Sequence, residues 1–404
     1  MPENSLMRAY MKKKVQLKLR DVKLTLDVSQ SLFSSHHIDT GTRHLLNALN
    51  PRKTEAFHKV LDLGCGYGPI GLTMARRYPK STVHMVDRDA LAVEFARENA
   101  RRNELANVRA YGSLGYEHVE DRDFDLVATN IPGKAGEDVI TTMLRGAQRI
   151  LNPEGEVAVV VVSPLIPLVT ALLEEPHVVL LDRVDKSSHS VFRYRFDAGA
   201  PPEEDHSAEG LYQREAMNFE VDDLFFTADT ALGLPEFDTL SYRTVLVIKV
   251  LVDLDVPTPG RMLVLNPGQG HAATAAWLTQ RPEAITLIGR DLLALRYSQL
   301  NLESNGCDPS RIATTHRIGI PEIEPSEESF DLVLMDLRDD ENPDVHAHLV
   351  RRAADVTREG GTLLVYGGST PVTRMLKAVD SDKRLLSRRR KRRKGDSLAI
   401  IERR

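Results

Sequence analysis

Apolar and polar residues alternate along the chain with two different periods. Short apolar runs of strand length are followed by longer segments in which apolar residues recur every three or four positions, as on one face of a helix. In the first half these patterns predict strands at 59–63, 82–86, 108–110, 124–129 and 156–162, and helices at 70–77, 90–103 and 138–150. Strands that alternate with helices predict an α/β fold with a mostly parallel, doubly wound sheet.

Further short strands and a polar segment complete this first half. Two strands are predicted at 15–19 and 24–27, a helix at 43–49, and a closing antiparallel hairpin at 178–184 and 191–196. Residues 198–210 are rich in Pro, Gly, Glu and Asp and show no apolar periodicity. We interpret this segment as an exposed linker.

The second half of the chain repeats the first: six matches share a constant offset of 202 positions, and Phe124-Asp125-Leu126-Val127 recurs as Phe330-Asp331-Leu332-Val333. Six residues show the constant offset: Gly66, Gly68, Arg88, Asp89, Asn99 and Asn103 recur as Gly268, Gly270, Arg290, Asp291, Asn301 and Asn305. The segment 39–43 has a looser counterpart at 238–243. A constant offset indicates a tandem duplication. We therefore expect a first domain at 1–197, a linker at 198–210 and a second domain at 211–404.

The strand at 59–63 opens into three closely spaced glycines, Gly64, Gly66 and Gly68. A strand, a tight turn and a helix start of this kind bring backbone N–H groups close to a ligand. One strand later the run 82–86 ends at Asp87, whose carboxylate is placed to accept ribose hydroxyls. Together these features predict a nucleotide-binding loop. Other nucleotide-binding α/β enzymes, such as dehydrogenases, remain the alternative at this point.

The two copies differ where a nucleoside would be held. Asp62, Gly64, Asp87 and Asn130 are replaced by Val264, Asn266, Gly289 and Asp336. These exchanges remove polar anchors for a nucleoside. We therefore interpret the second copy as a scaffold.

Composition excludes several classes of protein. With 42% hydrophobic and 27% charged residues, the chain has no apolar stretch long enough to cross a bilayer. Its N-terminus lacks the apolar core of a signal peptide, and Cys65 and Cys307 form no metal-ligand spacing. We expect a cytoplasmic protein without a membrane segment or a metal site. A net charge of −5 argues against a wholly basic nucleic-acid binder, although positive charge is concentrated at one place.

This concentration is a run of seven basic residues near the C-terminus. Its members are Arg388, Arg389, Arg390, Lys391, Arg392, Arg393 and Lys394. The run falls between predicted strands at 383–386 and 397–401, which predicts a hairpin loop. Seven like charges in one loop repel each other unless a polyanion is bound, so the run favours contact with RNA over a merely solvated loop.

The strand at 124–129 is followed by Asn130, Ile131, Pro132 and Gly133. An asparagine at the carboxyl end of this strand faces the ligand crevice of such a sheet, and a strand-end cap is the alternative reading. With the glycine loop and Asp87, this segment resembles class I S-adenosylmethionine-dependent methyltransferases, in the branch that methylates exocyclic or amide nitrogens. Their usual motif is Asn-Pro-Pro followed by an aromatic residue, from which Ile131 and Gly133 depart.

The duplication, the segments 33–35 and 39–42, and Lys134-Ala135-Gly136 resemble more narrowly the ribosomal small-subunit RNA guanine-N2 methyltransferases. This resemblance covers nearly the whole chain. It implies two tandem Rossmann-like class I methyltransferase domains, with a catalytic first domain and a degenerate second domain that binds RNA or has a structural role. It also implies S-adenosylmethionine as the cofactor and ribosomal RNA or a small-subunit particle as the partner.

The site residues follow from the same resemblance. The catalytic candidates are Asn130, Ile131 and Pro132, where the Asn130 side-chain oxygen and the Ile131 carbonyl accept the two protons of an amine. The cofactor-binding candidates are Asp62, Gly64, Cys65, Gly66, Gly68, Asp87 and Arg88. Two other functions stay open, namely a protein or small-molecule N-methyltransferase and a non-catalytic RNA-binding assembly factor.

Overall fold

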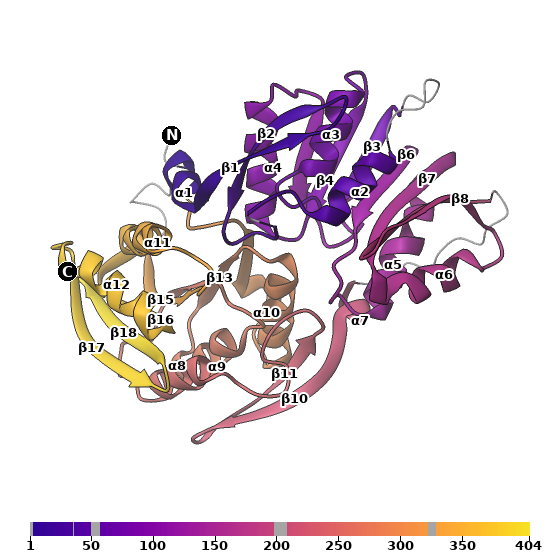
Figure 1. Cartoon of the computed structure of the whole chain (residues 1–404). Helices are drawn as coiled ribbons and strands as arrows, with labels where there is room; N and C mark the ends of the chain where they lie inside the picture. The colour runs from indigo at the N-terminus through magenta and orange to yellow at the C-terminus, as the bar shows by residue number, and fades with distance from the viewer. Residues whose placement is uncertain (1–2, 35, 50–56, 198–207, 322–328) are drawn as a thin grey trace. The chain divides into compact units, whose positions relative to one another are not determined.

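The computed structural model describes residues 3–34, 36–49, 57–197, 208–321 and 329–404 (Figure 1). It divides into two compact units, each with one seven-stranded sheet. The first unit comprises residues 11–212. The second unit comprises residues 213–404 together with the N-terminal segment that ends at Tyr10.

The sheet of the first unit has the strand order β5-β4-β3-β6-β7-β9-β8. Its strands are β3 (Lys59–Leu63), β4 (Thr82–Asp87), β5 (Val108–Gly112), β6 (Phe124–Asn130), β7 (Leu151–Val162), β8 (Val178–Asp185) and β9 (His189–Phe196). Strands β3 to β7 are parallel, and β9 runs antiparallel to both β7 and β8. The expected doubly wound α/β sheet with a closing hairpin is therefore confirmed.

Helices connect these strands. They are α2 (Thr40–Ala48), α3 (Pro69–Arg77), α4 (Ala90–Arg102), α5 (Glu137–Arg145), α6 (Ile166–Leu173) and α7 (Ala208–Tyr212). The helix expected at 138–150 ends early, in a 3-10 turn at Gly146–Arg149, and α6 was not expected. The apolar run of β7 is fully buried from Val157 to Val161, as predicted. Of the expected linker, residues 198–207 lie outside the described residues, and the rest begins α7.

The parallel register brings three strand ends to one edge of the sheet. Leu63, the last residue of β3, pairs with Val86 of β4 and with Thr129 of β6. The residues that follow at this edge are Gly64, Asp87 and Asn130. From β3 the strand order runs through β4 to β5 on one side and through β6 to β7 on the other. Ligands of an open α/β sheet usually bind at the carboxyl ends of the strands at such a reversal of strand order.

The repeated asparagines attach a separate hairpin to α4. Strands β1 (Met11–Lys18) and β2 (Lys23–Ser29) form a two-stranded antiparallel sheet. The Asn99 side chain accepts from the backbone N–H of Asp27 at 2.7 Å and donates to the carbonyls of Asp27 at 3.0 Å and Tyr67 at 2.9 Å. Asn103 bonds the backbone of Thr25 in the same way. Asn99 thereby links the hairpin to the glycine loop that contains Tyr67.

The second unit has the same architecture. Its sheet has the order β14-β13-β12-β15-β16-β18-β17, and β10 (Gln213–Val221) and β11 (Leu224–Ala231) form a separate hairpin. The sheet consists of β12 (Arg261–Leu265), β13 (Ala284–Gly289), β14 (Ile312–His316), β15 (Phe330–Leu337), β16 (Thr357–Gly368), β17 (Leu385–Arg393) and β18 (Asp396–Arg403). Its helices are α8 (Tyr242–Val252), α9 (His271–Gln280), α10 (Leu292–Ser304), α11 (Pro343–Val356) and α12 (Ser369–Asp380). Asn301 holds Asp229 of its hairpin as Asn99 holds Asp27, which supports the predicted duplication.

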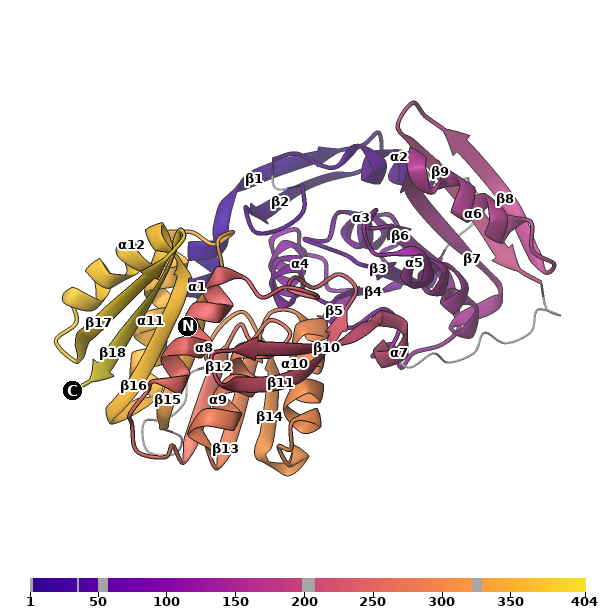
Figure 2. The same ribbon diagram turned by 90° about the horizontal axis from the view of Figure 1, so that it is seen from below.

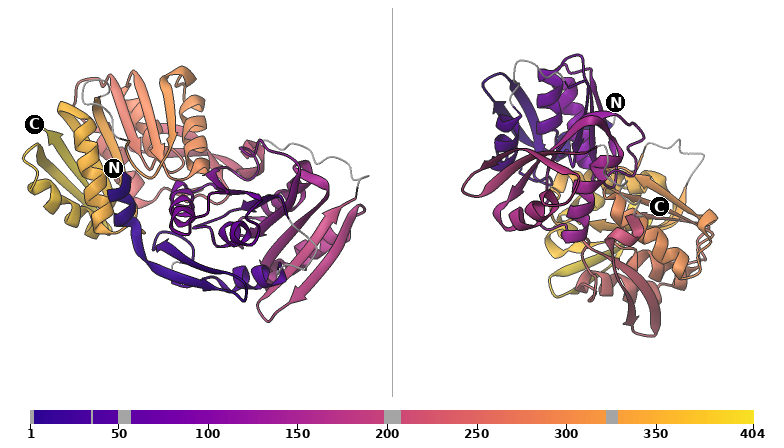
Figure 3. Two further views of the ribbon diagram at one scale, coloured as in Figure 1. Left: turned by 90° about the horizontal axis from the view of Figure 1, so that it is seen from above. Right: turned by 90° about the vertical axis from the view of Figure 1, so that its right-hand side faces the viewer.

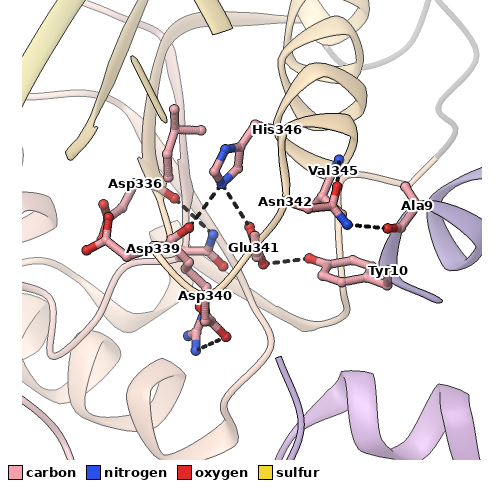
Figure 4. Close-up of polar contacts among 12 residues, drawn as sticks. Ala9, Tyr10, Asp336, Asp339, Asp340, Glu341, Asn342, Val345 and His346 are labelled. Carbon is pink, nitrogen blue, oxygen red and sulfur yellow. Dashed lines mark hydrogen bonds and ion pairs between the residues drawn. The ribbon is translucent and has the colours of Figure 1, made fainter. Parts of the chain in front are cut away.

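Helix α1 (Glu3–Tyr10) belongs to the second unit, although it comes first in the chain. It lies beside α11 in two perpendicular views (Figures 1 and 2). The Tyr10 hydroxyl donates to Glu341 at 2.6 Å, and the Asn342 amide donates to the Ala9 carbonyl at 2.5 Å (Figure 4). Leu6 is buried against Gly319. These buried contacts place residues 1–10 in the second unit, whereas the sequence pattern assigned them to the domain at 1–197.

The basic run does not form the expected hairpin loop. Residues 388–393 lie in β17, the edge strand of the second sheet, and only Lys394 and Gly395 form the turn to β18. The hairpin ends the chain and is yellow in Figure 3. The strand forms because its backbone pairs with the apolar strand β18, which leaves its side chains free to point to either face. Among the described residues, no helix is long and apolar enough to cross a membrane.

Candidate active site

The glycine loop follows β3 and begins α3. Gly64, Gly66 and Gly68 have positive φ angles of 75°, 53° and 96°, which side chains rarely allow. The N–H groups of Gly64 and Cys65 both donate to the Val86 carbonyl at 2.9 Å, which ties the loop to β4. A Cβ at Gly64 or Gly66 would have no neighbour within 4 Å, so open space borders the backbone here.

Asp62 lies within β3 directly beneath this loop and is fully buried. Its Oδ2 accepts a hydrogen bond from the Gly71 N–H at 2.7 Å. No described atom bonds its Oδ1, which is also buried. Burial raises the pKa of Asp62 to about 7, although the bond from Gly71 opposes the shift. Asp62 therefore fixes the first turn of α3 and keeps one acceptor available.

Asp87 ends β4 at the same edge. Its Oδ2 accepts from the Gly66 N–H and its Oδ1 from the Asp89 N–H, each at 2.9 Å. Burial raises the pKa of Asp87 to about 6 despite these two bonds. The residue is partly exposed, so the remaining lone pairs of its carboxylate can accept hydrogen bonds from the hydroxyl groups of a ribose.

The two other cofactor candidates have different surroundings. Cys65 is 4% exposed, and burial raises the pKa of its thiol well above the usual value, so it fills space and is no nucleophile. Arg88 follows Asp87 and is partly exposed. The structure thus brings the glycines, Asp62, Asp87 and Arg88 to one edge. Its open glycine backbone, unsatisfied buried acceptor and partly exposed carboxylate fit a nucleoside cofactor.

Asn130 ends β6 next to this loop. Its side-chain nitrogen donates to Asp39 Oδ2 at 3.0 Å and to Thr42 Oγ1 at 3.1 Å. Ile131 is buried, and its N–H continues the sheet by donating to the Val160 carbonyl at 3.1 Å. Pro132 is exposed at the start of the following turn. Asn130 is therefore held by side chains, which a plain strand-end cap would not require.

Asp39 and Thr42 were not among the candidate residues predicted from the sequence. Asp39 precedes α2 and is 91 residues from Asn130, so neither local periodicity nor motif spacing connects them. The available signal was their place in the segment 39–42, which resembled the same family as the Asn130 motif.

In the second copy, side chains of the chain itself occupy the corresponding edge. Helices α2 and α8 start at the N-caps Asp39 and Ser241, which places Arg243 at the position of Gly41. The Arg243 guanidinium donates to Asp336, the counterpart of Asn130, at 3.1 Å. The second copy therefore has an ion pair at the place where the first copy has the amide of Asn130, and it presents no amide oxygen there.

The loop of the second copy keeps its shape without its polar groups. Asn266 adopts a left-handed backbone with φ 56° and donates to the backbone carbonyl of Asp336 at 3.0 Å. Val264 is fully buried where the first copy has Asp62. The second copy therefore retains the turn but lacks both carboxylates of the first.

Comparison with known proteins places this site in a family. The model of the methyltransferase small domain matches residues 23–177, which lie within the first unit. The Bacillus subtilis protein YbxB, named as uncharacterized, is 34% identical over 145 residues, which is 36% of this chain and 71% of YbxB. The chain belongs to the methyltransferase small domain family. This confirms the expected class I S-adenosylmethionine-dependent methyltransferase, with S-adenosylmethionine as its cofactor.

Two further members and neighbours of the family were found. Ribosomal RNA small subunit methyltransferase C of Haemophilus influenzae is 35% identical over 141 residues, or 34% of this chain and 41% of that protein. The match thus spans less than half the length of that relative. A T. thermophilus 16S rRNA N2 methyltransferase, solved with AdoMet and guanosine, superposes with a TM-score of 0.68 over 98% of this chain and 100% of that chain. At 16% identity, this likeness establishes a common fold for the whole chain.

Titration calorimetry tests the assignment of the cofactor to the first copy. We expect one S-adenosylmethionine per chain, bound about tenfold more weakly at pH 5 than at pH 7.5, because Asp87 has a pKa of about 6. Protonation removes the charge that strengthens its bonds to hydroxyl groups, so affinity falls as the pH drops through this value. Asp87→Asn should bind weakly at both pH values and show a smaller dependence, because Asp62, with a pKa of about 7, still titrates in this range. Two sites per chain, or an unchanged slope in this variant, would contradict the assignment.

Proposed function

We propose that the protein transfers a methyl group from S-adenosylmethionine to the exocyclic N2 of a guanine in small-subunit ribosomal RNA. The observation that carries the proposal is the amide of Asn130, held at the carboxyl edge beside the glycine loop with its nitrogen bonded to Asp39 and Thr42. Its oxygen is thereby left to accept a proton of a substrate amine. The names of the H. influenzae relative and of the T. thermophilus neighbour support ribosomal RNA as the substrate class.

The residues at this edge act by positioning. The Asn130 side-chain oxygen and the Ile131 carbonyl accept hydrogen bonds from the two N–H groups of the amine. These bonds turn the nitrogen lone pair out of conjugation with the base. When bound, S-adenosylmethionine would supply an electrophilic methyl group, and the electron pair of the broken C–S bond would stay on the sulfur of the demethylated product. The alkylated nitrogen becomes acidic and releases its proton to water, so the site needs no strong base. Fixed orientation of this kind is worth several kcal/mol of the barrier.

The departures at Ile131 and Gly133 are compatible with this role. A backbone carbonyl accepts a proton whichever side chain residue 131 carries, and buried Ile131 anchors that carbonyl in the sheet. At Gly133 a Cβ would meet only Val162, at 3.4 Å, so this position leaves the edge open and supplies no side chain to stack on a base. Stacking of the target base must therefore come from another residue.

Transfer of a labelled methyl group tests the proposal. The protein is incubated with methyl-tritiated S-adenosylmethionine and either purified small-subunit ribosomal RNA or assembled small subunits, and the RNA is digested to nucleosides. We expect the label in N2-methylguanosine. Label in protein or in a small molecule would favour the other class of N-methyltransferase, and cofactor binding without transfer would favour an assembly factor.

We also propose that the edge strand β17 contacts RNA. Several of its cations are engaged: Arg388 pairs with Glu402, Lys391 with Asp253, and Arg390 donates to Thr373 and Ser397. Arg393 and Lys394 lie over the ring of Tyr242. Within the described part of the chain, the side chains of exposed Arg389 and Arg392 form no ion pair or hydrogen bond. These two guanidinium groups are therefore available to phosphate.

A salt series of RNA-binding isotherms measures this contribution. The double variant Arg389→Gln, Arg392→Gln should lower the slope of log affinity against log salt by about 0.7 to 0.9 per lost phosphate contact. Its S-adenosylmethionine affinity should not change. The control removes the same charge from exposed Arg281 and Arg351 of the same unit. Equal slopes for all three proteins would show that β17 is a solvated edge.

A further inference from the structure

We infer that Asp39 is a positioning residue of the reaction, which orients the Asn130 amide so that its oxygen faces the substrate amine. The inference rests on the proposed function, because it assigns a task to the same amide. It goes beyond that function by naming the group that determines which end of the Asn130 amide faces the substrate.

The hydrogen bonds around Asn130 use its nitrogen completely. The two N–H groups of the amide donate to Asp39 Oδ2 at 3.0 Å and to Thr42 Oγ1 at 3.1 Å. No described residue donates to the amide oxygen of Asn130, which is partly exposed at the end of β6. The nitrogen end is thus fixed by protein, and the oxygen end is left for a ligand.

Asp39 allows only this orientation. A carboxylate accepts hydrogen bonds and donates none, whereas an amide has one accepting and one donating end. Rotation of the Asn130 amide by 180° would place its oxygen against the carboxylate oxygen, which would lose the hydrogen bond to Asp39 and bring two acceptors together. Thr42 alone would not fix the orientation of the Asn130 amide, because a hydroxyl both donates and accepts hydrogen bonds.

Asp39 is itself held rigidly. It is the N-cap of α2, where its Oδ2 also accepts from the backbone N–H of Thr42 at 3.0 Å. Buried Leu45 and Leu46 pack α2 onto the sheet, and Figure 2 shows the helix beside β9. The carboxylate therefore has a fixed position relative to β6.

Gly41 makes this arrangement possible. A Cβ at residue 41 would lie 2.8 Å from His189 Cδ2 and 3.0 Å from Asp39 Oδ2, so a side chain there would displace the carboxylate. The second copy has Arg243 at this position and Ser241 in place of Asp39. Its strand end is Asp336, which needs no orienting carboxylate. The carboxylate and the amide thus occur together in the first copy and are both replaced in the second.

The variant Asp39→Ser tests the inference with little structural change. Serine caps helices about as well as aspartate, so α2 should keep its stability. The hydroxyl of serine can both donate and accept hydrogen bonds, and the Asn130 amide is then no longer held in one orientation. We expect kcat for methyl transfer to fall about tenfold or more, with the S-adenosylmethionine Kd and the thermal midpoint unchanged. The same substitution at exposed Asp197 of the first unit is the control and should leave kcat unchanged.

A double variant separates positioning from other roles. If Asp39 acts through the amide, Asp39→Ser should cause no further loss when Asn130 is already alanine. Rates are measured in single turnovers with excess enzyme, so that slow variants remain measurable. A multiplied loss in the double variant, or a fall in the thermal midpoint of Asp39→Ser, would overturn the inference. If Asn130→Ala loses activity while Asp39→Ser keeps full kcat, the inference alone is overturned. Full activity in Asn130→Ala would instead overturn the proposed function.

Discussion

Replacing Asn130 by alanine is expected to lower the rate of methyl transfer about a hundredfold or more. The lost interaction is one that the amide oxygen makes with the reacting nitrogen, so it contributes mainly in the transition state. Affinity for S-adenosylmethionine should stay nearly unchanged, because Asn130 lies on a different strand from Asp62 and Asp87. Single-turnover transfer of the labelled methyl group, together with calorimetric titration of the cofactor, measures both quantities.

The control for this experiment is a conservative change in the same bonds. Thr42→Val removes one of the two acceptors of the Asn130 amide and leaves the amide in place. It should cost clearly less than Asn130→Ala. If Asn130→Ala loses stability and not rate, the asparagine serves as a strand-end cap, and the methyl-transfer role proposed for it is wrong.

Replacing Arg290 by leucine is expected to destabilise the second unit by about 3–5 kcal/mol. The Arg290 guanidinium lies 3.2 Å from Glu341, and the side chains are 2% and 0% exposed. Burial and the nearby Glu341 raise the pKa of Tyr10 well above its usual value, so its hydroxyl stays protonated and donates to this carboxylate. Removal of the guanidinium leaves the buried Glu341 carboxylate with the Tyr10 hydroxyl and with the His346 ring at 3.8 Å (Figure 4), and these contacts do not replace the guanidinium.

The chain offers a specific probe for this measurement. Trp277 is its only tryptophan and is buried in α9 of the second unit, so tryptophan fluorescence during urea unfolding follows this unit alone. Arg351→Leu changes an exposed arginine of α11 and should stay within about 0.5 kcal/mol of the parent. An equally small effect for Arg290→Leu would show that the buried pair contributes no net stability.

Local patterns in the sequence predicted most of the first sheet and its ligand-binding edge. The period of two or 3.6 residues located the strands, and the glycines with Asp87 marked the loop, because each signal lies within one strand and one turn. The edge formed as predicted since a parallel sheet brings the carboxyl ends of its central strands together. The duplication was visible because the asparagines that hold the hairpins repeat at the same offset.

Contacts between distant segments were not predictable in this way. Asp39 meets Asn130 across 91 residues, and Tyr10 meets Glu341 across 331 residues, so no motif spacing contains either pair. The run at 388–393 was predicted as a loop because it has no apolar residue, yet an edge strand needs only its backbone to pair. Two of its charged side chains reach the neighbouring helices, since Arg390 donates to Thr373 of α12 and Lys391 pairs with Asp253 at the end of α8.

The attachment of α1 to the second unit has a consequence for the order of events during synthesis. Tyr10 leaves the ribosome 331 residues before Glu341, which at about 5–20 residues per second is an interval of roughly 15 to 70 s. Residues 11–212 can complete their own fold in that time. During the same interval α1 lacks the surface of the second unit that buries Leu6 and Tyr10. Helix α1 is thus synthesised before residues 11–212 and packed after them. Until then the growing chain exposes the side of α1 that carries Leu6 and Tyr10.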